Sequence, residues 1–323
     1  MKRRTINFAL GLAAAAWPPL ARGQQSSKPL RVGLVGLTTF GSEDAFIQRL
    51  GELGFVEGRN LSIVREVPFP EYLDASFAYL VKSGADILLA AGSESVLKSA
   101  IRAAAGRVPV VCVAMDYDLL RSGYVVSLAR PGANLTGIFV RQPELAIKRL
   151  EMARDALPKV RRVALWWDGN VAREQYEASF GAAASLGVDL RSVEVGSVSY
   201  NFADAIKQMS EIGAEAIVLA SSSVYDEARA TISRAALEHR LPLVAFTRGF
   251  VEVGALLSYG ANFQGVWRRV ADYVARIAGG TNPSALPIEH PTTFELAVNL
   301  RTASSLGLSL TPAVLGRADE VVD

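Results

Sequence analysis

The chain has 323 residues, half of them hydrophobic, and a formal net charge of +2. This length is enough for two α/β domains with substantial cores, and the positive mean hydropathy fits buried parallel strands and alanine-rich helices. The first 23 residues carry four basic side chains and no acidic one, which leaves the rest of the chain at −2. The weak negative charge of residues 24–323 argues against nucleic acid as a partner.

The N-terminus has the three parts of a secretory signal. Residues 2–4 (KRR) are basic, residues 6–17 are apolar, and residues 21–23 (ARG) end in a small residue typical of a cleavage site. The apolar part is too short to span a membrane, so we expect export and a mature chain that begins at Gln24. The twin-arginine and Sec routes are both compatible with this signal. We therefore predict a periplasmic protein whose signal peptide, residues 1–23, is removed.

The first half of the mature chain alternates strands and helices. Apolar runs predict strands, and the amphipathic segments between them predict helices. The order β-α-β-α predicts a parallel sheet wound by right-handed crossovers. Because the run at residues 87–91 is continuously apolar, we expect helices on both faces of the sheet. The predicted strands are residues 30–37, 61–67, 87–91 and 108–114, and the predicted helices are residues 43–53, 72–82 and about 94–105.

Residues 121–140 interrupt this alternation, since two extended segments flank a turn at residues 130–132 (RPG). We interpret this region as the passage from one lobe into the other. A second series of strands and helices then repeats the first series weakly. Its predicted strands are residues 163–167, 190–195, 216–220 and 243–246, and its predicted helices are residues 144–157, 173–186, 202–212 and 225–239.

The remaining chain is expected to return to the first lobe after residues 255–259, with a long amphipathic helix at residues 266–278. A strand at 292–298 and a short helix at 302–306 follow, and no pattern in residues 308–323 decides which lobe holds them. The predicted fold class is α/β, with two similar doubly wound parallel-sheet lobes and a ligand cleft between them. Lobe 1 comprises residues 24–139 plus about 261–282, and lobe 2 comprises residues 140–260 plus about 283–323.

The loop after the third predicted strand is the first candidate site. Gly92 allows a tight turn, Ser93 is a good N-cap, and Ser95 lies in the first helical turn. A helix that begins after a parallel strand directs unpaired N–H groups into the crevice above the sheet, which suits a carboxylate. An ordinary capped helix is the alternative. Residues 221–223 (SSS) hold the corresponding place in the second half, so both loops are predicted to form the two sides of a clamp.

Other polar and aromatic side chains also follow strands in both halves. Hydroxyl groups suit a carboxylate, Asp116 or Asp118 suits an ammonium or hydroxyl group, and aromatic rings suit a planar ligand. Loop caps and core residues are the structural alternatives. Trp166 and Trp167 must face opposite ways, so at most one can reach the cleft, and Trp167 is nearer the strand end. The predicted ligand-binding residues are Thr38, Thr39, Phe40, Ser93, Ser95, Asp116, Tyr117, Trp167, Asp168, Ser221, Ser222, Tyr225 and Arg248.

Enzyme signatures are few. The chain has no phosphate-binding glycine motif and no Cys/His cluster with metal-ligand spacing, and neither His239 nor His290 follows a predicted strand. Its single cysteine, Cys112, lies in an apolar strand, so no intramolecular disulfide can form. Ser95 and Lys98 match the S-x-x-K pattern of serine acyl-enzymes, but no S-D-N or K-T-G motif follows them. We predict no catalytic residue, metal or cofactor.

Several segments together resemble one family. They are the signal region, residues 54–60 (GFVEGRN), 127–137 (SLARPGANLTG), 257–260 (LSYG), 294–300 (FELAVNL) and 317–321 (RADEV). Over essentially the whole chain the sequence resembles ABC-transporter substrate-binding proteins of the tryptophan/tyrosine type. The resemblance implies a type I periplasmic-binding-protein fold with three crossovers between its lobes. It also implies capture of a small carboxylate, often aromatic or amino-acid-like, for an ABC permease in the inner membrane.

The same resemblance matches particular residues. Ser93 and Ser95 correspond to the loop that takes the ligand carboxylate, and Asp116 to the acidic position after the fourth strand. The family usually has proline where this chain has Tyr117, and Asn-Pro where it has residues 168–169 (DG). These departures add an aromatic ring and a carboxylate to the expected cleft.

We therefore expect a monomeric solute-binding protein that closes on its ligand by hinge bending and performs no chemistry. A periplasmic sensing module for a membrane receptor is an alternative that would use the same cleft. A serine hydrolase using Ser95 and Lys98 is a less favoured one.

Overall fold

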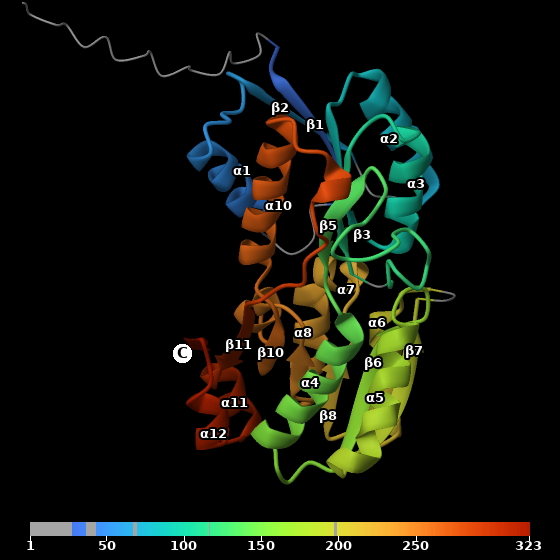
Figure 1. Cartoon of the computed structure of the whole chain (residues 1–323). Helices are drawn as coiled ribbons and strands as arrows, with labels where there is room; N and C mark the ends of the chain where they lie inside the picture. The colour runs from blue at the N-terminus through green and yellow to red at the C-terminus, as the bar shows by residue number, and fades with distance from the viewer. Residues whose placement is uncertain (1–27, 37–42, 67–69, 116, 197–198) are drawn as a thin grey trace, which may run out of the picture.

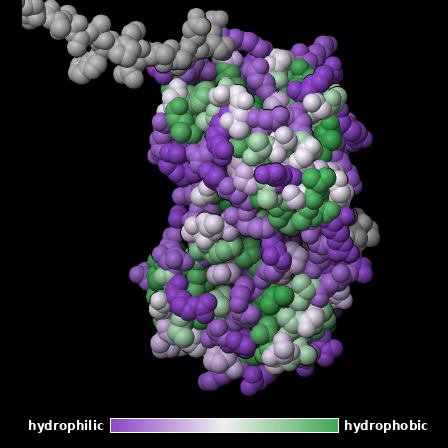
Figure 2. All heavy atoms as spheres, viewed as in Figure 1, coloured by the Kyte–Doolittle hydropathy of each residue, from purple (hydrophilic) through white to green (hydrophobic). Residues whose placement is uncertain are grey.

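The computed structural model describes residues 28–36, 43–66, 70–115, 117–196 and 199–323. Two α/β lobes lie end to end, and the chain passes between them near the middle of the molecule (Figure 1). Figure 2 shows an indented outline where the lobes meet and mainly hydrophilic side chains over the visible face. The predicted signal peptide and four predicted site residues, Thr38, Thr39, Phe40 and Asp116, lie outside the described residues.

Lobe 1 is built on a five-stranded sheet in which every pair of neighbours is parallel, as the strand–helix alternation predicts. Its strand order is β2-β1-β3-β4-β5. The strands are β1 (Leu30–Val35), β2 (Leu61–Glu66), β3 (Ile87–Gly92), β4 (Val110–Ala114) and β5 (Leu135–Phe139). β3 and β4 are buried along nearly their whole length, which is why their sequences show no alternation.

Four helices cover the two faces of this sheet. One core cluster joins α1 (Glu43–Glu52) and the distant α10 (Phe263–Ala278) to one face, and the other joins α2 (Leu73–Lys82) and α3 (Glu94–Ala104) to the opposite face. A short 3₁₀ turn, Pro70–Tyr72, leads into α2. In Figure 1, α1 and α10 lie side by side, although more than 200 residues of chain separate them.

Lobe 2 is built on a seven-stranded sheet with the order β12-β11-β10-β9-β8-β6-β7. Only the pairing of β10 with β11 is antiparallel within this sheet as described. The strands are β6 (Arg162–Asp168), β7 (Asp189–Val195), β8 (Ala216–Leu219), β9 (Leu243–Ala245), β10 (Leu257–Ala261), β11 (Phe294–Asn299) and β12 (Glu320–Val322). β12 pairs with β11, so the C-terminal stretch, whose placement the sequence leaves open, belongs to lobe 2.

The helices of lobe 2 also cover both faces of its sheet. They are α4 (Gln142–Ala156), α5 (Arg173–Leu186), α6 (Phe202–Glu211), α7 (Ser223–Glu227), α8 (Arg229–Glu238), α9 (Arg248–Glu252), α11 (Leu300–Leu306) and α12 (Pro312–Leu315). The sequence predicts one helix over 225–239, whereas the structure has α7 and α8 with a break at Ala228. None of the helices in the described ranges has the length and apolar character needed to span a bilayer.

Within the described residues the chain crosses between the sheets three times: from β5 into α4, from β10 into α10, and before β11. The third crossing comes later than the expected boundary near residue 283. A 3₁₀ turn at Pro283–Ala285 leads into residues 286–289, which lie along β5: Thr136 Oγ1 donates to the Leu286 carbonyl (3.0 Å) and Phe139 N to the Glu289 carbonyl (2.8 Å). Because this segment satisfies the exposed edge of β5, it stays with lobe 1, and the crossing follows His290.

Candidate ligand-binding site

The carboxyl ends of strands from both sheets meet at the beginning of α10. Gly36, Gly92 and Met115, at the ends of β1, β3 and β4, line a small depression together with Phe263 and Trp267 of α10. Gly36 has a φ of +99°, and a Cβ there would lie 2.0 Å from the Ala91 carbonyl oxygen, so only glycine allows the two strand ends to approach this closely.

A second pocket, of about 180 Å³, continues from the same helix start into lobe 2. Phe263 lines both pockets, and Thr247 and Arg248, which follow β9, line the second. Strand ends of both lobes therefore converge on one region beside the second crossing. The Brändén rule places ligands of open α/β sheets at this kind of edge.

The two serines predicted to bind a carboxylate stand at the N-terminus of α3. Ser93 is the N-cap residue and is half-buried, with extended backbone (φ −72°, ψ 165°) and no side-chain hydrogen bond to the helix. Ser95 is exposed in the first turn. The first amides of a helix have no partner within the helix. Lobe 1 therefore presents hydroxyl groups and helix amides at this point, although neither Ser93 nor Ser95 lines the two pockets at the beginning of α10.

Glu94 lies between these serines, and the sequence does not single it out. Its carboxylate accepts a hydrogen bond from Tyr124 OH (2.8 Å) and pairs with Lys98 Nζ (3.1 Å). Desolvation raises the pKa of Glu94, but the hydrogen bonds from Tyr124 and Lys98 outweigh it and leave the pKa below its ordinary value. Since Lys98 is paired with Glu94 and no hydrogen bond joins it to Ser95, the contacts of the described residues do not form the Ser–Lys arrangement of a hydrolase.

Tyr117 belongs to the core of lobe 1. It is 7% exposed and lies in the cluster formed with α2 and α3, where its ring meets that of Tyr124 edge-on at 6.2 Å. The proline-to-tyrosine departure therefore adds apolar packing under the loop that follows β4.

Asp168 in lobe 2 is fully buried, and donors of the protein itself surround it. Its Oδ2 accepts from Ser222 Oγ (2.7 Å) and Tyr200 OH (3.1 Å), and its Oδ1 accepts from the Asn170 backbone amide (2.9 Å). The carboxylate therefore joins the loops after β6, β7 and β8. Asp168 and Ser222 are both predicted ligand contacts, and in this structure they bind each other.

The predicted aromatic contacts of lobe 2 lie in its core. Trp167 is 6% exposed and stacks on Tyr176 at 4.6 Å, whereas Trp166 is fully buried against Tyr225 at 5.7 Å. The two tryptophans face opposite sides of the sheet, as adjacent strand residues must. Tyr225 OH donates to the Val195 carbonyl (3.4 Å). Neither Trp167 nor Tyr225 lines the two pockets at the beginning of α10.

Ser221 is held by a glutamine that the sequence does not single out. Gln175 Oε1 accepts from the Ser221 amide (2.8 Å), and Gln175 Nε2 donates to the Ser221 carbonyl (2.9 Å). The fully buried Arg149 donates through Nη2 to the same Oε1 (3.0 Å). Both partners lie far from Ser221 in the sequence, so no local motif indicates them.

Arg248 is the predicted residue that lines the 180 Å³ pocket. It pairs with Glu252 and Glu320, both at 2.9 Å. Opposite it, Asn262 Nδ2 donates to Glu295 Oε2 (2.9 Å). Burial raises the pKa of Glu295, and nearby Arg248 only partly offsets this rise. The pocket thus carries charges of both signs beside the crossing.

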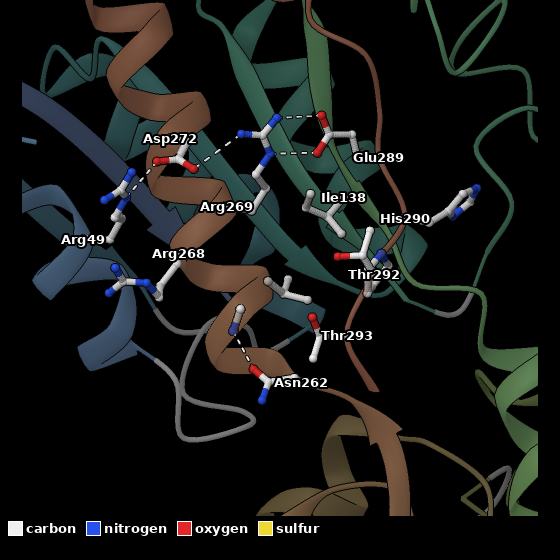
Figure 3. Close-up of a pocket in the computed structure, with 13 residues that line it drawn as sticks. Arg49, Ile138, Asn262, Arg268, Arg269, Asp272, Glu289, His290, Thr292 and Thr293 are labelled. Atoms are coloured by element: carbon white, nitrogen blue, oxygen red, sulfur yellow. Dashed lines mark hydrogen bonds and ion pairs between the residues drawn. The ribbon is translucent and has the colours of Figure 1, made fainter. Parts of the chain in front are cut away.

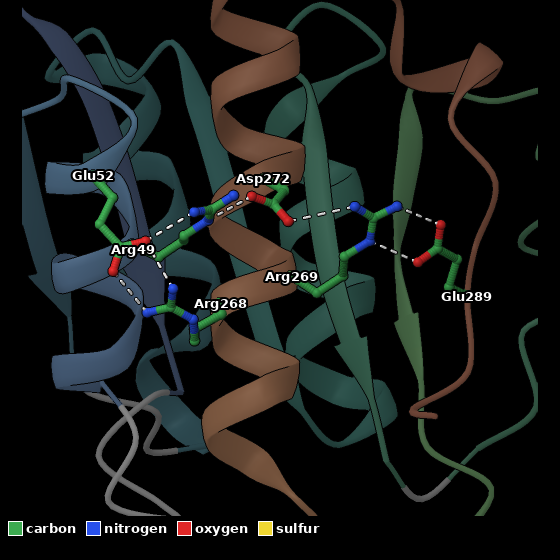
Figure 4. Close-up of polar contacts among 6 residues, drawn as sticks. All are labelled: Arg49, Glu52, Arg268, Arg269, Asp272 and Glu289. Atoms are coloured by element: carbon green, nitrogen blue, oxygen red, sulfur yellow. Dashed lines mark hydrogen bonds and ion pairs between the residues drawn. The ribbon is translucent and has the colours of Figure 1, made fainter. Parts of the chain in front are cut away.

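A larger pocket, of about 500 Å³, lies between α10 and the third crossing, and its lining includes Ile138 near the end of β5 and Asn262 directly after β10 (Figure 3). Its polar wall belongs to a chain of ion pairs in which three arginines alternate with three carboxylates (Figure 4). Arg269 forms two 2.7 Å hydrogen bonds with Glu289, and its presence holds the pKa of that carboxyl below its ordinary value. The other members are Arg49, Glu52, Arg268 and Asp272. This network joins α1, α10 and the chain before the third crossing.

No group of three or more histidine, cysteine, aspartate or glutamate side chains suited to a metal ion occurs in the part of the chain that the structure describes. The carboxylates in the ion pairs described above have arginine or lysine partners within the protein.

Comparison with known proteins identifies the family. The sequence model described as ABC transporter substrate binding protein matches residues 46–322. A tyrosine-binding protein of Clostridioides difficile (strain R20291) is 22% identical over 295 residues, which cover 88% of this chain and 82% of the relative.

Two solved structures share the fold. A conserved domain protein from Vibrio cholerae O1 biovar eltor has a TM-score of 0.81 and 23% identity, with 91% of this chain and all of the other covered. An ABC domain from Streptococcus pneumonia in complex with L-Trp has a TM-score of 0.80 and 18% identity, with the same coverage. The expected two-lobed, type I periplasmic-binding fold is confirmed, and the chain belongs to the ABC transporter substrate-binding protein family.

Proposed function

We propose that this protein is the extracytoplasmic solute-binding component of an ABC uptake transporter. It takes up a small carboxylate-bearing ligand, aromatic or amino-acid-like, between its lobes and closes by bending at the crossings. The observation that carries this proposal is the convergence of strand ends from both sheets at the beginning of α10, beside crossings of only a few residues. The protein delivers the ligand to a permease in the inner membrane and performs no chemistry itself.

The proposed ligand class is supported by the polar groups at the start of α3, which follows Gly92 of the small depression, and by the family. Ser93, Ser95 and the first amides of α3 offer hydrogen-bond donors to a carboxylate. One relative is a tyrosine-binding protein, and one structure of similar fold is a complex with L-Trp. The order of preference among contacts is therefore Ser93 and Ser95 first, followed by Arg248 in the neighbouring pocket.

We infer the subcellular location of the protein from its N-terminal sequence and its family. The basic and apolar segments of residues 1–23 have the composition of a cleaved signal peptide. Removal of that segment releases a monomeric chain into the periplasm, where it meets the permease. Mass spectrometry of the protein from a periplasmic extract tests this step, with a mature N-terminus at Gln24 as the expected result.

The proposed function is tested by thermal unfolding of the mature protein with a panel of small carboxylates. L-tyrosine, L-tryptophan and benzoate are compared with tyramine and tryptamine, which keep the aromatic rings but have no carboxylate. A ligand at one hundred times its dissociation constant adds about 2.7 kcal/mol to the free energy of unfolding. We expect at least one carboxylate to raise Tm, and its decarboxylated counterpart to have no effect. If a broad metabolite panel gives no shift, the proposed function is wrong.

A further inference from the structure

One ion pair joins the two lobes at a place away from the crossings. Arg121, in the loop after β4, donates through Nη1 to Glu174 Oε1 in the first turn of α5, at 3.3 Å. Among the described residues it is the one ion pair between a side chain of lobe 1 and a side chain of lobe 2. Both side chains are exposed, Arg121 at 80% and Glu174 at 41%.

The loop that carries Arg121 is rigidly built. Asp118 Oδ1 accepts hydrogen bonds from the backbone amides of Leu120 (2.8 Å) and Arg121 (3.1 Å). The Ser122 amide donates to the Asp118 carbonyl and the Tyr124 amide to the Leu119 carbonyl. These bonds hold the backbone of Arg121 in place, so its side chain extends from a hydrogen-bonded loop.

The same loop is tied to the lobe 1 side of the candidate site. Tyr124 OH donates to Glu94 Oε1, and Glu94 stands between Ser93 and Ser95 in the sequence. This hydrogen bond joins the α3 N-terminus to the Arg121 loop.

An equivalent connection exists in lobe 2. Gln175, the neighbour of Glu174, holds both backbone polar groups of Ser221 with its side-chain amide. Arg149 links this amide to β10, since its Nη1 lies 3.5 Å from the Tyr259 carbonyl oxygen, two residues before β10 ends. The first turn of α5 therefore contacts lobe 1 and the loop after β8, and Arg149 links it to the strand that enters the second crossing.

We propose that Arg121 and Glu174 form a latch that stabilises the closed arrangement of the lobes. The pair forms only when the lobes are close, because Arg121 belongs to lobe 1 and Glu174 to lobe 2. On each side the pair is connected to a strand-end loop. An exposed pair of this kind is worth a factor of about two to five in an equilibrium. The latch therefore adjusts the closed-to-open ratio, and with it the rate of ligand release, without contacting the ligand. The proposal rests on the proposed function in so far as closure serves ligand capture.

The test measures lobe separation directly in the full mature chain. Dyes on Lys82→Cys in lobe 1 and Lys207→Cys in lobe 2 report the distance between lobes by single-molecule energy transfer, because Cys112 is fully buried. We expect Arg121→Glu to lower the closed-to-open ratio about two- to fivefold, with and without L-tyrosine. The double variant Arg121→Glu/Glu174→Arg should recover the wild-type ratio, and high salt should weaken the wild-type latch.

Glu177→Gln is the matched control. Glu177 lies on the same helix and pairs with Arg173 within lobe 2, so its loss removes an exposed ion pair but not the latch. The proposal is overturned if Arg121→Glu leaves the ratio unchanged, if the double variant fails to recover it, if Glu177→Gln lowers it equally, or if the wild-type protein has no closed population. These outcomes differ from the result that would contradict the proposed function. That result is that no small molecule raises the Tm of the wild-type protein.

Discussion

The strand-end loops of the two lobes contain similar residues but use them differently. After β3 in lobe 1, Ser93 makes no side-chain capping bond and Ser95 is exposed. In lobe 2, Asp168 at the end of β6 and Ser222 after β8 are hydrogen-bonded to each other, and Asp168 also accepts hydrogen bonds from Tyr200 and Asn170. Lobe 1 therefore leaves the Ser93 hydroxyl without a bond to its own helix, while lobe 2 uses its polar groups to hold its own loops in place.

This difference shows why residue type after a strand is a weak guide to a binding role. A carboxylate removed from water needs several donors, and Asp168 obtains them from within the protein. A hydroxyl at a half-buried helix start keeps its bonding capacity for another molecule. The same position in two related lobes can thus be structural in one and ligand-facing in the other.

The largest expected effect is that of Asp168→Ala. The substitution leaves Ser222 Oγ, Tyr200 OH and a backbone amide without their charged acceptor, so we expect the free energy of unfolding to fall by about 3 kcal/mol. Urea unfolding of the ligand-free protein measures this loss. Asp74→Ala, which removes a mostly exposed carboxylate, serves as the control and should cost no more than about 1 kcal/mol. Unchanged stability with loss of ligand binding would instead make Asp168 a ligand contact.

An intermediate effect is expected from the double variant Ser93→Ala/Ser95→Ala in lobe 1. Because neither hydroxyl supports the fold, the free energy of unfolding without ligand should change by less than about 0.5 kcal/mol. Affinity for the carboxylate that raises Tm should fall about tenfold, or 1.4 kcal/mol, in a calorimetric titration. Ser304→Ala, at an exposed position of α11, is the matched control. A double variant that binds as tightly as the wild type would remove both serines from the site.

The smallest expected effect concerns Glu295, beside the second crossing. Burial raises its pKa in the folded protein, so the ionised carboxylate lowers stability when the pH is above that pKa. Glu295→Gln keeps an acceptor for Asn262 Nδ2 and should slightly raise the free energy of unfolding at pH 7. The advantage should vanish as the pH falls through the raised pKa towards the ordinary glutamate value. Urea unfolding across this pH range checks the sign, and a less stable variant at pH 7 would contradict it.

Much of the fold could be predicted from the sequence because local patterns carry it. Continuous apolar runs ending at glycine, such as residues 87–92, mark strands that are covered on both faces. The last strand was missed, since β12 is only three residues long and depends on pairing with β11. Likewise, residues 286–289 remain with lobe 1 because β5 offers an open edge, and no local signal reports that edge.

For the predicted site residues, the position along the chain relative to the strands was easier to predict than the partners of the side chains. The sequence places Ser93, Ser221 and Arg248 after strands, and the structure agrees, whereas Asp168 is the last residue of β6. It does not indicate Gln175, which acts across 46 residues on Ser221. The direction in which a side chain points, and the groups that it hydrogen-bonds, depend on distant segments of the chain that come together only when the sheets form.

The sequence by itself determined the alternation of strands and helices, the two-lobed architecture and the family, because hydrophobic periodicity and short motifs are local properties. Only the tertiary structure decided which polar groups find partners within the protein, where the third crossing begins, and that Arg121 meets Glu174 between lobes. These features depend on contacts between distant segments, whose energies arise from burial and hydrogen bonding in the folded chain and leave no periodic trace in the sequence.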